Sequence, residues 1–519
     1  MKKAVITTLL LALGFNSYSQ DKPKLVVGIV VDQMRYDYIY RFWEDFSDDG
    51  FKKLINEGYF FRNTNFGYMP TYTGPGHASI FTGTTPAIHG IIGNSWYDKY
   101  TQTSVYCAGD GDMQTVCNCD NHKTDVLSND GQMSPHRMLT TTIGDELQLF
   151  NTESKVIGIS LKDRGAILPA GHMGDAAYWM DANGEWISSS YYMESLPEWM
   201  LHYQKINTVS DYLKGKWKGK NFSYDLDSLT AKHGPNIIKS TPFGNTVLKD
   251  LAKEIIIQEK LGQGTNTDFF SISFSSSDYV GHQYGPHAEE LIDTYIRLDN
   301  DIADLLKTLE KNIGVENVLL FLTADHGVVS VPNELKKYKI PAGYFDVSEA
   351  LSALKEYLTK QFGEGKWIQK YSNQQFYLNN SLIQEKNLRK EDVEIVCSNF
   401  LISFEGIKNT FTSSQLHNNE YKYGIHALVQ KGFSQKRSGD IIINLESGWI
   451  EWKSPRGTTH GSCYSYDTHV PLIFWGKNIK QGVSDEAVFI RDIAPTVCTL
   501  LGISFPNGCT GSPIQIITE

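Results

Sequence analysis

The chain has 519 residues, which is too long for one simple core, so we expect one large domain that carries insertions, or two to three domains. A hydrophobic fraction of 41% and a charged fraction of 21% exclude a disordered or fibrous protein. The 48 Lys and Arg residues against 59 Asp and Glu give a net charge of −11, and the basic residues are scattered, which argues against a duplex nucleic acid as partner.

Residues 1–19 have the layout of a secretory signal peptide. Two lysines precede an apolar run from Ala4 to Phe15, and small and polar residues follow it. The run is too short to span a membrane and no Cys near the cleavage point could accept a lipid, so we predict cleavage around Ser19. We therefore expect a periplasmic or secreted protein without a stable membrane anchor. The alternative is an N-terminal membrane anchor.

Three apolar runs predict strands that end at a carboxylate. The first, Leu25–Val31, is rich in β-branched residues, which is typical of a strand buried on both faces of a parallel sheet. The same pattern recurs at Phe269–Phe274 and at Val318–Leu322. The carboxylates that come after the three runs are, in order, Asp32, Asp278 and Asp325.

The remaining elements indicate an α/β fold. Helical spacing of Leu298, Ile302, Leu305 and Leu309 predicts a helix between the second and third runs, and so a strand, helix, strand unit with a parallel crossover. Further candidate strands are Val156–Ser160 and Val470–Trp475, and Asp492–Leu501 predicts a C-terminal helix closed by Gly502. We expect a mostly parallel central sheet flanked by helices, with ligands bound at the carboxyl ends of its strands.

The composition of the chain changes from about residue 331. The segment 331–450 contains the amphipathic stretch Val347–Tyr357 and short alternating strands such as Asp440–Asn444, and we interpret it as a cap inserted into the core. The core is then formed by 20–330 and 451–519. Residues 95–150 and 170–240, rich in Tyr, Trp, Gly and Asn, predict loop insertions over the ligand-binding face.

Seven cysteines fit export into an oxidising compartment. Cys107, Cys117 and Cys119 are close enough in the sequence to pair locally, and an odd number leaves at least one thiol unpaired. None has zinc-finger spacing, so we interpret them as structural rather than as metal ligands.

His and Asp residues placed where strands end indicate metal chemistry. Asp278 and His282 are four residues apart in D-Y-V-G-H, so a helical turn or a tight loop would bring both to one ion. Each residue alone could be a cap, a turn or a hydrogen-bonded loop side chain, but strand ends converge on one edge of a sheet, which favours a shared site. The full inventory suits two zinc ions and consists of Asp32, Asp278, His282, Asp325, His326 and His460.

Thr73 is the candidate nucleophile. It lies in T-Y-T-G-P-G-H-A-S-I-F-T-G, where Pro75 can open a helix that runs through Phe81. A hydroxyl at a helix N-terminus meets free backbone N–H groups and a positive dipole end, which together favour a phosphoryl group. The alternative is a simple N-cap threonine. Because its hydroxyl is a weak nucleophile, Thr73 requires activation, which coordination to zinc would supply.

These motifs resemble the alkaline phosphatase superfamily, specifically its threonine-nucleophile branch of exported, phosphate-irrepressible alkaline phosphatases, which is related to the nucleotide pyrophosphatase/phosphodiesterases. The resemblance runs through most of the mature chain. It is carried, in order, by V-V-D-Q-M-R (Val30 to Arg35), T-Y-T-G-P-G-H (Thr71 to His77), G-N-S-W-Y (Gly93 to Tyr97), S-L-K-D-R-G (Ser160 to Gly165), D-Y-V-G-H (Asp278 to His282), T-A-D-H-G (Thr323 to Gly327) and H-G-S (His460 to Ser462).

The resemblance implies a zinc-dependent alkaline phosphatase that hydrolyses small phosphate monoesters through a covalent phosphothreonine on Thr73. We expect a monomer, although the sequence does not reveal the oligomeric state. It also implies that Asn94 and the backbone amide of Thr73 bind nonbridging phosphoryl oxygens. The implied ligands are Asp278, His282 and His460 for one zinc, and Asp32, Asp325, His326 and the Thr73 oxygen for the other. A promiscuous role in scavenging phosphate is an expectation from the resemblance, and the natural substrate stays open.

Lys162 and Arg164 distinguish the subclass. Two residues apart at the end of an extended segment, they can point to the same side and neutralise a dianionic monoester. Similar diesterases usually lack this pair and use an apolar pocket for the second ester group, so we favour a monoesterase. The alternative for the pair is solvated surface charge.

Three other functions are alternatives to the monoesterase. A nucleotide pyrophosphatase/phosphodiesterase would share the metals, the threonine and the asparagine. A sulfatase is disfavoured, because Thr73-Gly74-Pro75-Gly76-His77 stands where a C/S-x-P-x-R motif would be needed. An inactive exported protein that captures phosphate is disfavoured by the complete set of candidate ligands and nucleophile.

Overall fold

The computed structural model describes residues 22–118 and 129–518. The predicted signal peptide, residues 1–19, and Cys119 lie outside this range. Within it, every helix is too short or too polar to cross a lipid bilayer.

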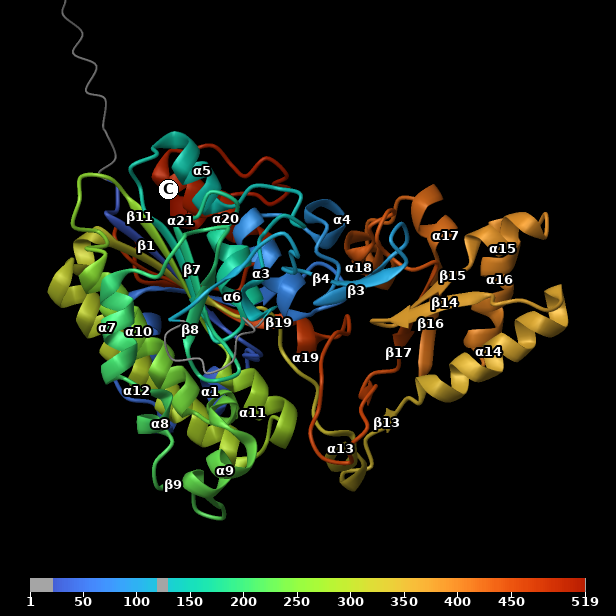
Figure 1. Ribbon diagram of the computed structural model, residues 1–519, viewed down its shortest axis with the longest axis horizontal. Helices are drawn as coiled ribbons and strands as arrows, with labels where there is room; N and C mark the ends of the chain where they lie inside the picture. Colours follow the sequence, from blue (N-terminus) through green and yellow to red (C-terminus); the bar gives the residue numbers. More distant parts are fainter. Residues whose placement is uncertain (1–21, 119–128, 519) are drawn as a thin grey trace, which may run out of the picture.

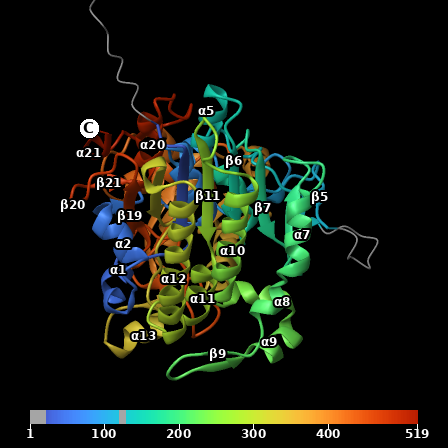
Figure 2. The same ribbon diagram turned by 90° about the vertical axis from the view of Figure 1, so that its left-hand side faces the viewer.

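A large mixed sheet with helices packed around it forms the centre of the molecule, which confirms the predicted α/β class (Figures 1 and 2). In the described part of the chain this sheet has 11 strands in the order β20-β2-β19-β12-β1-β11-β6-β7-β8-β5, with β21 beside β2. Their bounds are β1 (Leu25–Val31), β2 (Tyr59–Asn65), β5 (Thr115–Val116), β6 (Val156–Ser160), β7 (Ala176–Met180), β8 (Trp186–Ser189), β11 (Asp268–Phe274), β12 (Val318–Thr323), β19 (His469–Gly476), β20 (Gly482–Ser484) and β21 (Val488–Phe489).

The five strands predicted from apolar runs are all present in this sheet, with bounds within one residue. β1 lies between β11 and β12 and pairs with both in parallel, so its carboxyl end is level with theirs. All seven residues of β1 are buried, as the apolar run predicts for a strand covered on both faces. β19 instead runs antiparallel to β12 and β2, an orientation that its apolar pattern does not encode.

Helices cover the sheet, and Figure 2 shows α10 and α12 in front of it. The predicted crossover helix is α12, and its four periodic leucine and isoleucine positions are fully buried. The predicted C-terminal helix is α20, which ends at Gly502 in the left-handed region. The helices around the sheet are α1 (Tyr38–Arg41), α2 (Phe51–Glu57), α3 (Thr73–Thr82), α4 (Pro86–His89), α5 (Ile143–Phe150), α6 (Asp163–Ala170), α7 (Glu198–Ile206), α8 (Val209–Tyr212), α9 (Leu226–His233), α10 (Phe243–Gln258), α11 (Ser276–Tyr284), α12 (Glu289–Asn312), α13 (Pro332–Lys337), α19 (Ser465–Thr468), α20 (Ile493–Leu501) and α21 (Gln515–Thr518).

Residues 343–450, here called the small unit, form a second body to the right of the large sheet in Figure 1. The unit has a hydrophobic core of its own, and the chain enters and leaves it side by side, because β13 (Gly343–Tyr344) pairs with β18 (Trp449–Ile450). Its four-stranded sheet has the order β14-β15-β17-β16. The other bounds are α14 (Val347–Phe362), β14 (Ile368–Ser372), β15 (Gln375–Leu378), α15 (Asn380–Glu385), α16 (Lys390–Leu401), β16 (Ile407–Thr412), α17 (Ser413–Asn418), α18 (Gly424–Gly432) and β17 (Ile441–Leu445). The domain bounds 20–330, 331–450 and 451–519 stay predictions.

The segments 95–150 and 170–240 are only partly loops. β7 and β8 extend the large sheet, and Tyr178 and Trp179 of β7 are buried in it, because aromatic side chains suit a strand as well as a surface loop. Two further hairpins pair β3 (Ser95–Asp98) with β4 (Thr103–Tyr106) and β9 (Lys216–Lys218) with β10 (Ser223–Asp225). Cys107, directly after β4, is a buried free thiol, so the local pairing considered for it is not formed.

Candidate active site

The carboxyl ends of three neighbouring strands carry the candidate metal ligands. Asp32 follows β1, Asp325 and His326 follow β12, and β11 leads through Ser275 into α11, which carries Asp278. All four of these acidic and histidine side chains are buried. The parallel register of the three strands therefore brings together, at one edge of the sheet, residues that are up to 294 positions apart in the sequence (326 − 32).

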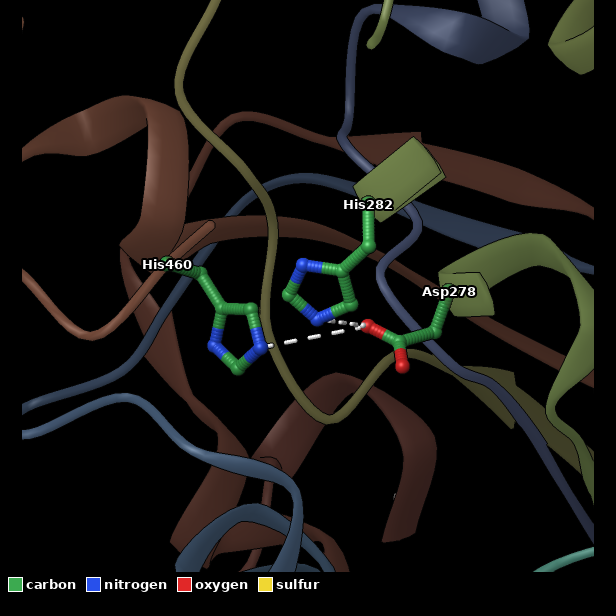
Figure 3. Close-up of side chains that lie close together, drawn as sticks. All are labelled: Asp278, His282 and His460. Carbon is green, nitrogen blue, oxygen red and sulfur yellow. Dashed lines mark ion pairs between the residues drawn. The ribbon is translucent and has the colours of Figure 1, made fainter. Parts of the chain in front are cut away.

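One ligand group is built on α11. Asp278 and His282 are one helical turn apart, with His282 Nε2 3.1 Å from Asp278 Oδ1, and His460 Nε2 lies 3.8 Å from the same oxygen. Figure 3 shows both imidazole rings turned toward this carboxylate. The Nδ1 atoms lie 2.8 Å from Thr458 O and 2.7 Å from Thr71 O, and donation to these carbonyls leaves both Nε2 atoms as lone-pair ligands. The three side chains can therefore hold one metal ion.

A second ligand group surrounds His326. Its Nε2 atom lies 3.4 Å from Asp32 Oδ1 and 3.6 Å from Asp325 Oδ2, while its Nδ1 atom is 2.9 Å from Gly327 O. Ligand atoms of Asp32, His326 and Asp278 also lie within 4.8 Å of one another. Asp278 thus belongs to both groups: its Oδ1 atom lies near His282 and His460, and Lys162 Nζ bridges its Oδ2 atom to Asp32 Oδ2.

The donor set fits two divalent cations. Asp32 Oδ1 and Asp325 Oδ2 are buried and accept no hydrogen bond, which is costly for carboxylate oxygens unless a cation binds them. Burial, together with the charges of Asp278 and Asp325, raises the pKa of Asp32 well above its usual value. A cluster of carboxylates and imidazoles is the ligand chemistry that zinc takes in proteins, so the residues present match the predicted cofactor.

Thr73 is the first residue of α3, and Tyr72 is its N-cap, so the simple N-cap interpretation of Thr73 is wrong. Thr73 is buried, and its Oγ1 atom lies 3.4 Å from His326 Nε2. The next residue, Gly74, donates its backbone N–H to Asn94 Oδ1 at 2.8 Å. The hydroxyl therefore lies beside a candidate ligand histidine, at a helix N-terminus whose Gly74 N–H is already bound by the Asn94 amide oxygen.

Lys162 and Arg164 do not lie on an extended segment. β6 ends at Ser160, and α6 begins at Asp163, because Lys162 is the extended N-cap residue and Arg164 is already in the first helical turn. They still reach one cavity of about 210 Å³, which Tyr279 also lines, so the interpretation as solvated surface charge is wrong. Both side chains line this cavity although only Lys162 has an extended backbone.

The lysine contacts the acidic cluster directly. Lys162 Nζ lies 2.5 Å from Asp32 Oδ2 and 2.6 Å from Asp278 Oδ2. Burial opposes its charge, but Asp278 and Asp32 raise the pKa of Lys162 above its usual value, so the side chain stays cationic. Arg164 Nη1 donates to the hydroxyl of Tyr106 at 2.9 Å, and Tyr106 in turn donates to Asp163. Lys162 thus contacts the carboxylates of the acidic cluster, whereas Arg164 reaches the same cavity and is held by Tyr106.

Gln33 and His77 are site residues that the sequence interpretation did not assign. Gln33, in the left-handed region at φ 66°, donates its Nε2 to Asp278 Oδ1 at 2.6 Å and its backbone N–H to Asp325 Oδ1 at 3.2 Å. His77 Nδ1 lies 2.9 Å from Thr73 O and 3.3 Å from Asp325 Oδ2. Both residues stand inside motifs that carry assigned residues, and that neighbourhood is the signal that could have found them.

The structure therefore gathers the six predicted Asp and His ligands around Thr73, with Asn94 on one side and Lys162 beside Asp32 and Asp278. Arg164 contacts none of the predicted ligands and reaches the cavity from the side of Tyr106. The roles given to these residues are proposals.

A family profile and individual relatives both match most of this chain. The profile "Type I phosphodiesterase / nucleotide pyrophosphatase" matches residues 26–467. A protein of Myroides odoratus named "Calcium-transporting ATPase" is 40% identical over 100% of this chain and 99% of its own length. Alkaline phosphatase PafA of Elizabethkingia meningoseptica is 38% identical over 95% of this chain and 94% of its own.

A crystal structure of wild-type alkaline phosphatase PafA superposes on this fold with a TM-score of 0.88, at 38% identity, covering 96% of this chain and 99% of the PafA chain. The profile spans most of the chain, and both relatives named above align over nearly all of it. The chain therefore belongs to the type I phosphodiesterase/nucleotide pyrophosphatase family, within the alkaline phosphatase superfamily.

Proposed function

We propose that this protein is an exported two-zinc alkaline phosphatase that hydrolyses phosphate monoesters through a phosphothreonine formed on Thr73. The observation that carries the proposal is the pair of cations, Lys162 and Arg164, that line one cavity. Lys162 also contacts the buried cluster of Asp and His side chains, whose His326 lies 3.4 Å from the Thr73 hydroxyl. A terminal phosphoryl group carries two negative charges and three oxygens, and this arrangement offers charge and donors for all of them.

The relatives support a reaction at a terminal phosphoryl group. PafA and a second relative, PhoV of Synechococcus elongatus, are both named alkaline phosphatases and are each 38% identical to this chain. The relative named as an ATPase agrees with the same chemistry, because the γ-phosphoryl group of ATP is also terminal and can carry two charges.

The metal ligands follow from the two groups at the sheet edge. One zinc would be held by Asp278, His282 and His460, and the other by Asp32, Asp325, His326 and the Thr73 oxygen. When bound, the two ions would supply Lewis-acid stabilisation of negative charge on the reacting oxygens. The support for this assignment is the donor chemistry and the two buried carboxylate oxygens that accept no hydrogen bond.

The residues of the chain divide the remaining work. Thr73 Oγ attacks phosphorus, so that one O–P bond forms and the bond to the departing alkoxide breaks; water later cleaves the phosphothreonine and releases phosphate. The backbone N–H of Thr73 at the start of α3 and the Asn94 amide orient the nonbridging oxygens. Lys162 and Arg164 offset the charge on these oxygens through both steps, and their burial strengthens this effect.

Replacement of the nucleophile tests the mechanism. Thr73→Ala should remove the covalent phosphoenzyme and lower turnover by at least about a thousandfold, while zinc stays bound. Acid-quenched mixtures with a radiolabelled aryl phosphate measure the label that stays on the protein. Thr82→Ala, at the far end of the same helix, is the matched control and should keep the label. Covalent phosphate accumulating on the Thr73→Ala protein would contradict the assignment.

A second candidate function is a phosphodiesterase, which the name of the family profile favours. Paired aryl phosphate mono- and diesters separate the two functions. Lys162→Ala and Arg164→Ala should each reduce kcat/KM for the monoester far more than for the diester, because a diester carries one charge fewer. Equal losses on both substrates would support the diesterase.

Export, oligomeric state and the cap also belong to the proposal. The layout of residues 1–19 supports a periplasmic or secreted enzyme with a cleaved leader. A monomer is also part of the proposal. The N-terminal mass of the purified exported protein tests the cleavage: a chain that begins near Gln20 agrees, whereas one that still begins at Met1 does not. The separate hydrophobic core of the small unit supports the interpretation of 331–450 as an inserted cap.

A further inference from the structure

The segment that carries Asn94 is a connection without helix or strand of its own between α4 and β3. On the side of the large sheet, it is held at Asn94 itself: Oδ1 accepts the Gly74 N–H at 2.8 Å, and the carbonyl accepts the Cys107 N–H at 2.9 Å. A connection of this kind has few ways to fix a side chain to within a fraction of an ångström, so further contacts decide how firmly the amide is held.

The small unit contacts this segment on both sides of Asn94. Upstream, Arg437 Nη1 donates to Gly90 O at 2.6 Å. Immediately downstream, Asn373 Nδ2 donates to Ser95 O at 2.6 Å. At the end of β3, Lys99 Nζ lies 3.3 Å from the buried Asp440 Oδ1. Three residues of the small unit therefore bracket a stretch of ten residues, 90–99, with Asn94 inside it.

Asn373 sits at the tip of a tight hairpin. Asn373 and Gln374 have φ of 53° and 60° and connect β14 to β15, whose ends pair Ser372 with Gln375. Two central residues in the left-handed region form the turn that suits the twist of paired strands. The Ile443 N–H donates to Gln374 O at 2.9 Å, so the tip is tied to a central strand of the small sheet.

The tip and the segment approach each other closely at Gly93. A methyl group on Gly93 would lie 2.5 Å from Asn373 Nδ2, so only glycine leaves room for this contact. The residue before Asn94 is thus packed against the Asn373 amide, and the residue after it accepts the hydrogen bond from the same amide.

We propose that Asn373 is a positioning residue for the reaction: it fixes the backbone on both sides of Asn94 and thereby holds the Asn94 amide at the phosphoryl site. The inference rests on the role proposed above for Asn94. Small errors in the placement of a group that orients substrate lower the rate without any loss of metal, because the cost is one of geometry. The small unit then contributes to turnover through this contact, although all the predicted zinc ligands lie outside it.

Asn373→Gly tests the inference without disturbing the turn. Glycine adopts a φ of 53° without strain, so the variant removes the amide and keeps the hairpin. Loss of one hydrogen bond predicts a decrease in kcat/KM for an aryl monoester of about three- to tenfold. The inhibition constant of inorganic phosphate should rise by a similar factor, with bound zinc unchanged. Asn387→Gly, at the same φ of 53° but exposed elsewhere in the small unit, is the control and should leave both values unaltered.

A double-mutant cycle with Asn94→Ala separates positioning from a general loss of structure. If Asn373 acts through Asn94, Asn373→Gly has no further effect on kcat/KM or phosphate inhibition in the Asn94→Ala background. Independent, additive losses would overturn the inference while leaving the role of Asn94 intact, and so would an unchanged Asn373→Gly enzyme. An Asn94→Ala enzyme with full activity would overturn both the inference and the proposed role of Asn94.

Discussion

At the scale of single residues, the cluster depends on side chains that hold the ligands rather than bind metal. The backbone conformation of Gln33 is unfavourable, because residues other than glycine are uncommon at a φ of 66°. Its amide donates to Asp278 and its backbone N–H donates to Asp325, which joins the strand ends β1, β11 and β12. A methyl group on Gly281 of α11 would lie 1.9 Å from Gln33 Oε1, so the fit between the two residues is close.

Gln33→Gly should weaken metal binding by about tenfold or more, because removal of a hydrogen bond to a ligand carboxylate has effects of this size. Glycine accepts the left-handed backbone, so the substitution removes the amide without straining the turn. Competition with a chromogenic chelator measures the zinc affinity. Asn478→Gly, also at positive φ and exposed, should not change it. Equal affinities of the Gln33→Gly and wild-type proteins would contradict this account.

The sequence allowed the proximity of the six Asp and His residues to be predicted, because several of them follow strands of one sheet and Asp278 and His282 are one helical turn apart. The supporting residues were harder. The contact from Gln33 to Asp278 spans 245 positions. Tyr106 contacts Arg164 from a hairpin that the apolar pattern of the sequence does not predict. Such contacts depend on how loops cross one another in space, which period and spacing do not encode.

At the scale of elements, α3 positions the proposed nucleophile Thr73, and glycines let this helix approach the neighbouring loop. A methyl group on Gly76 would lie 2.2 Å from the backbone oxygen of Asp325, which cannot move aside as a flexible side chain could. The G-P-G sequence after Thr73 is thus needed for packing as well as for starting the helix.

Gly76→Ala should destabilise the protein by about 1–3 kcal/mol, since overpacking against backbone forces the helix and the Asp325 loop apart. It should also weaken zinc binding, because Asp325 and His326 move with that loop. Urea unfolding and zinc titration measure the two effects. Gly111→Ala, where an added methyl group meets nothing within 4 Å, is the matched control. A Gly76→Ala protein as stable as this control would show that the loop yields.

The pair α10 and α12 contains a buried carboxyl with a pH-dependent cost. Burial raises the pKa of Asp301 on α12 to about 7, although Lys249 lies 3.8 Å away and Thr246 donates to it at 2.9 Å. The same carboxyl ionises at lower pH in the unfolded chain than in the folded one. The folded protein is therefore most stable when Asp301 is protonated, and its free energy of unfolding decreases as the pH rises from about 4 to about 7.

The free energy of unfolding of Asp301→Asn, relative to that of the wild type, should therefore be higher at pH 8 than at pH 5 by roughly 2–4 kcal/mol. Asp304, one turn further along α12, has the opposite sign: burial opposes its charge, but Lys249 and Lys253 hold its pKa below the usual value. Because both the usual pKa and the lowered one lie below about 4, Asp304→Asn should lower stability by a similar amount from pH 5 to pH 8 and have less effect only below about pH 4. Denaturant unfolding of Asp301→Asn from pH 5 to pH 8 and of Asp304→Asn from pH 5 to pH 3 measures the two pH dependences, and a destabilisation by Asp304→Asn that grows as the pH falls would contradict the assignment.

The central strands could be predicted because a strand that is buried on both faces needs apolar residues at nearly every position. The helical spacing of apolar residues predicted α12. The antiparallel direction of β19 and the strand character of β7 were not predicted. Direction depends on where the chain re-enters the sheet, and β19 follows the long excursion through the small unit. Ala176–Met180 is short and aromatic, a composition that occurs in strands and surface loops alike.

At the scale of the whole molecule, the site unites segments from most of the chain. Asp32 comes from the first strand, Asp278 and His326 from the middle of the sequence, and His460 from the segment that follows the small unit. Asp467, further along, accepts the backbone N–H groups of Gly461 and Ser462 at 3.1 and 2.8 Å and so fixes the loop beside His460. Only the folded chain places these groups around one site, whereas the unfolded chain holds them apart.

Metal binding should for this reason stabilise the folded protein as a whole. The ammonium of Lys162 contacts two buried aspartates, Asp32 and Asp278, and a third, Asp325, is buried beside His326, so the cluster carries excess negative charge that divalent cations would offset. A ligand that binds only the folded state adds about 4 kcal/mol when its free concentration is a thousand times its dissociation constant. The melting temperature should rise steadily with the logarithm of free zinc and fall after chelation.

The variant His460→Ala sharpens this test, because it removes one ligand while Asp32, Asp325 and His326 stay in place. Its melting temperature should rise less steeply with zinc than that of wild type, since one ion loses a third of its protein ligands. His417→Ala, a substitution in α17 of the small unit, should follow the wild-type curve. If zinc left the melting temperature of the wild-type protein unchanged, the buried carboxylates would need another partner, and the assignment of two metal sites would fail with the prediction.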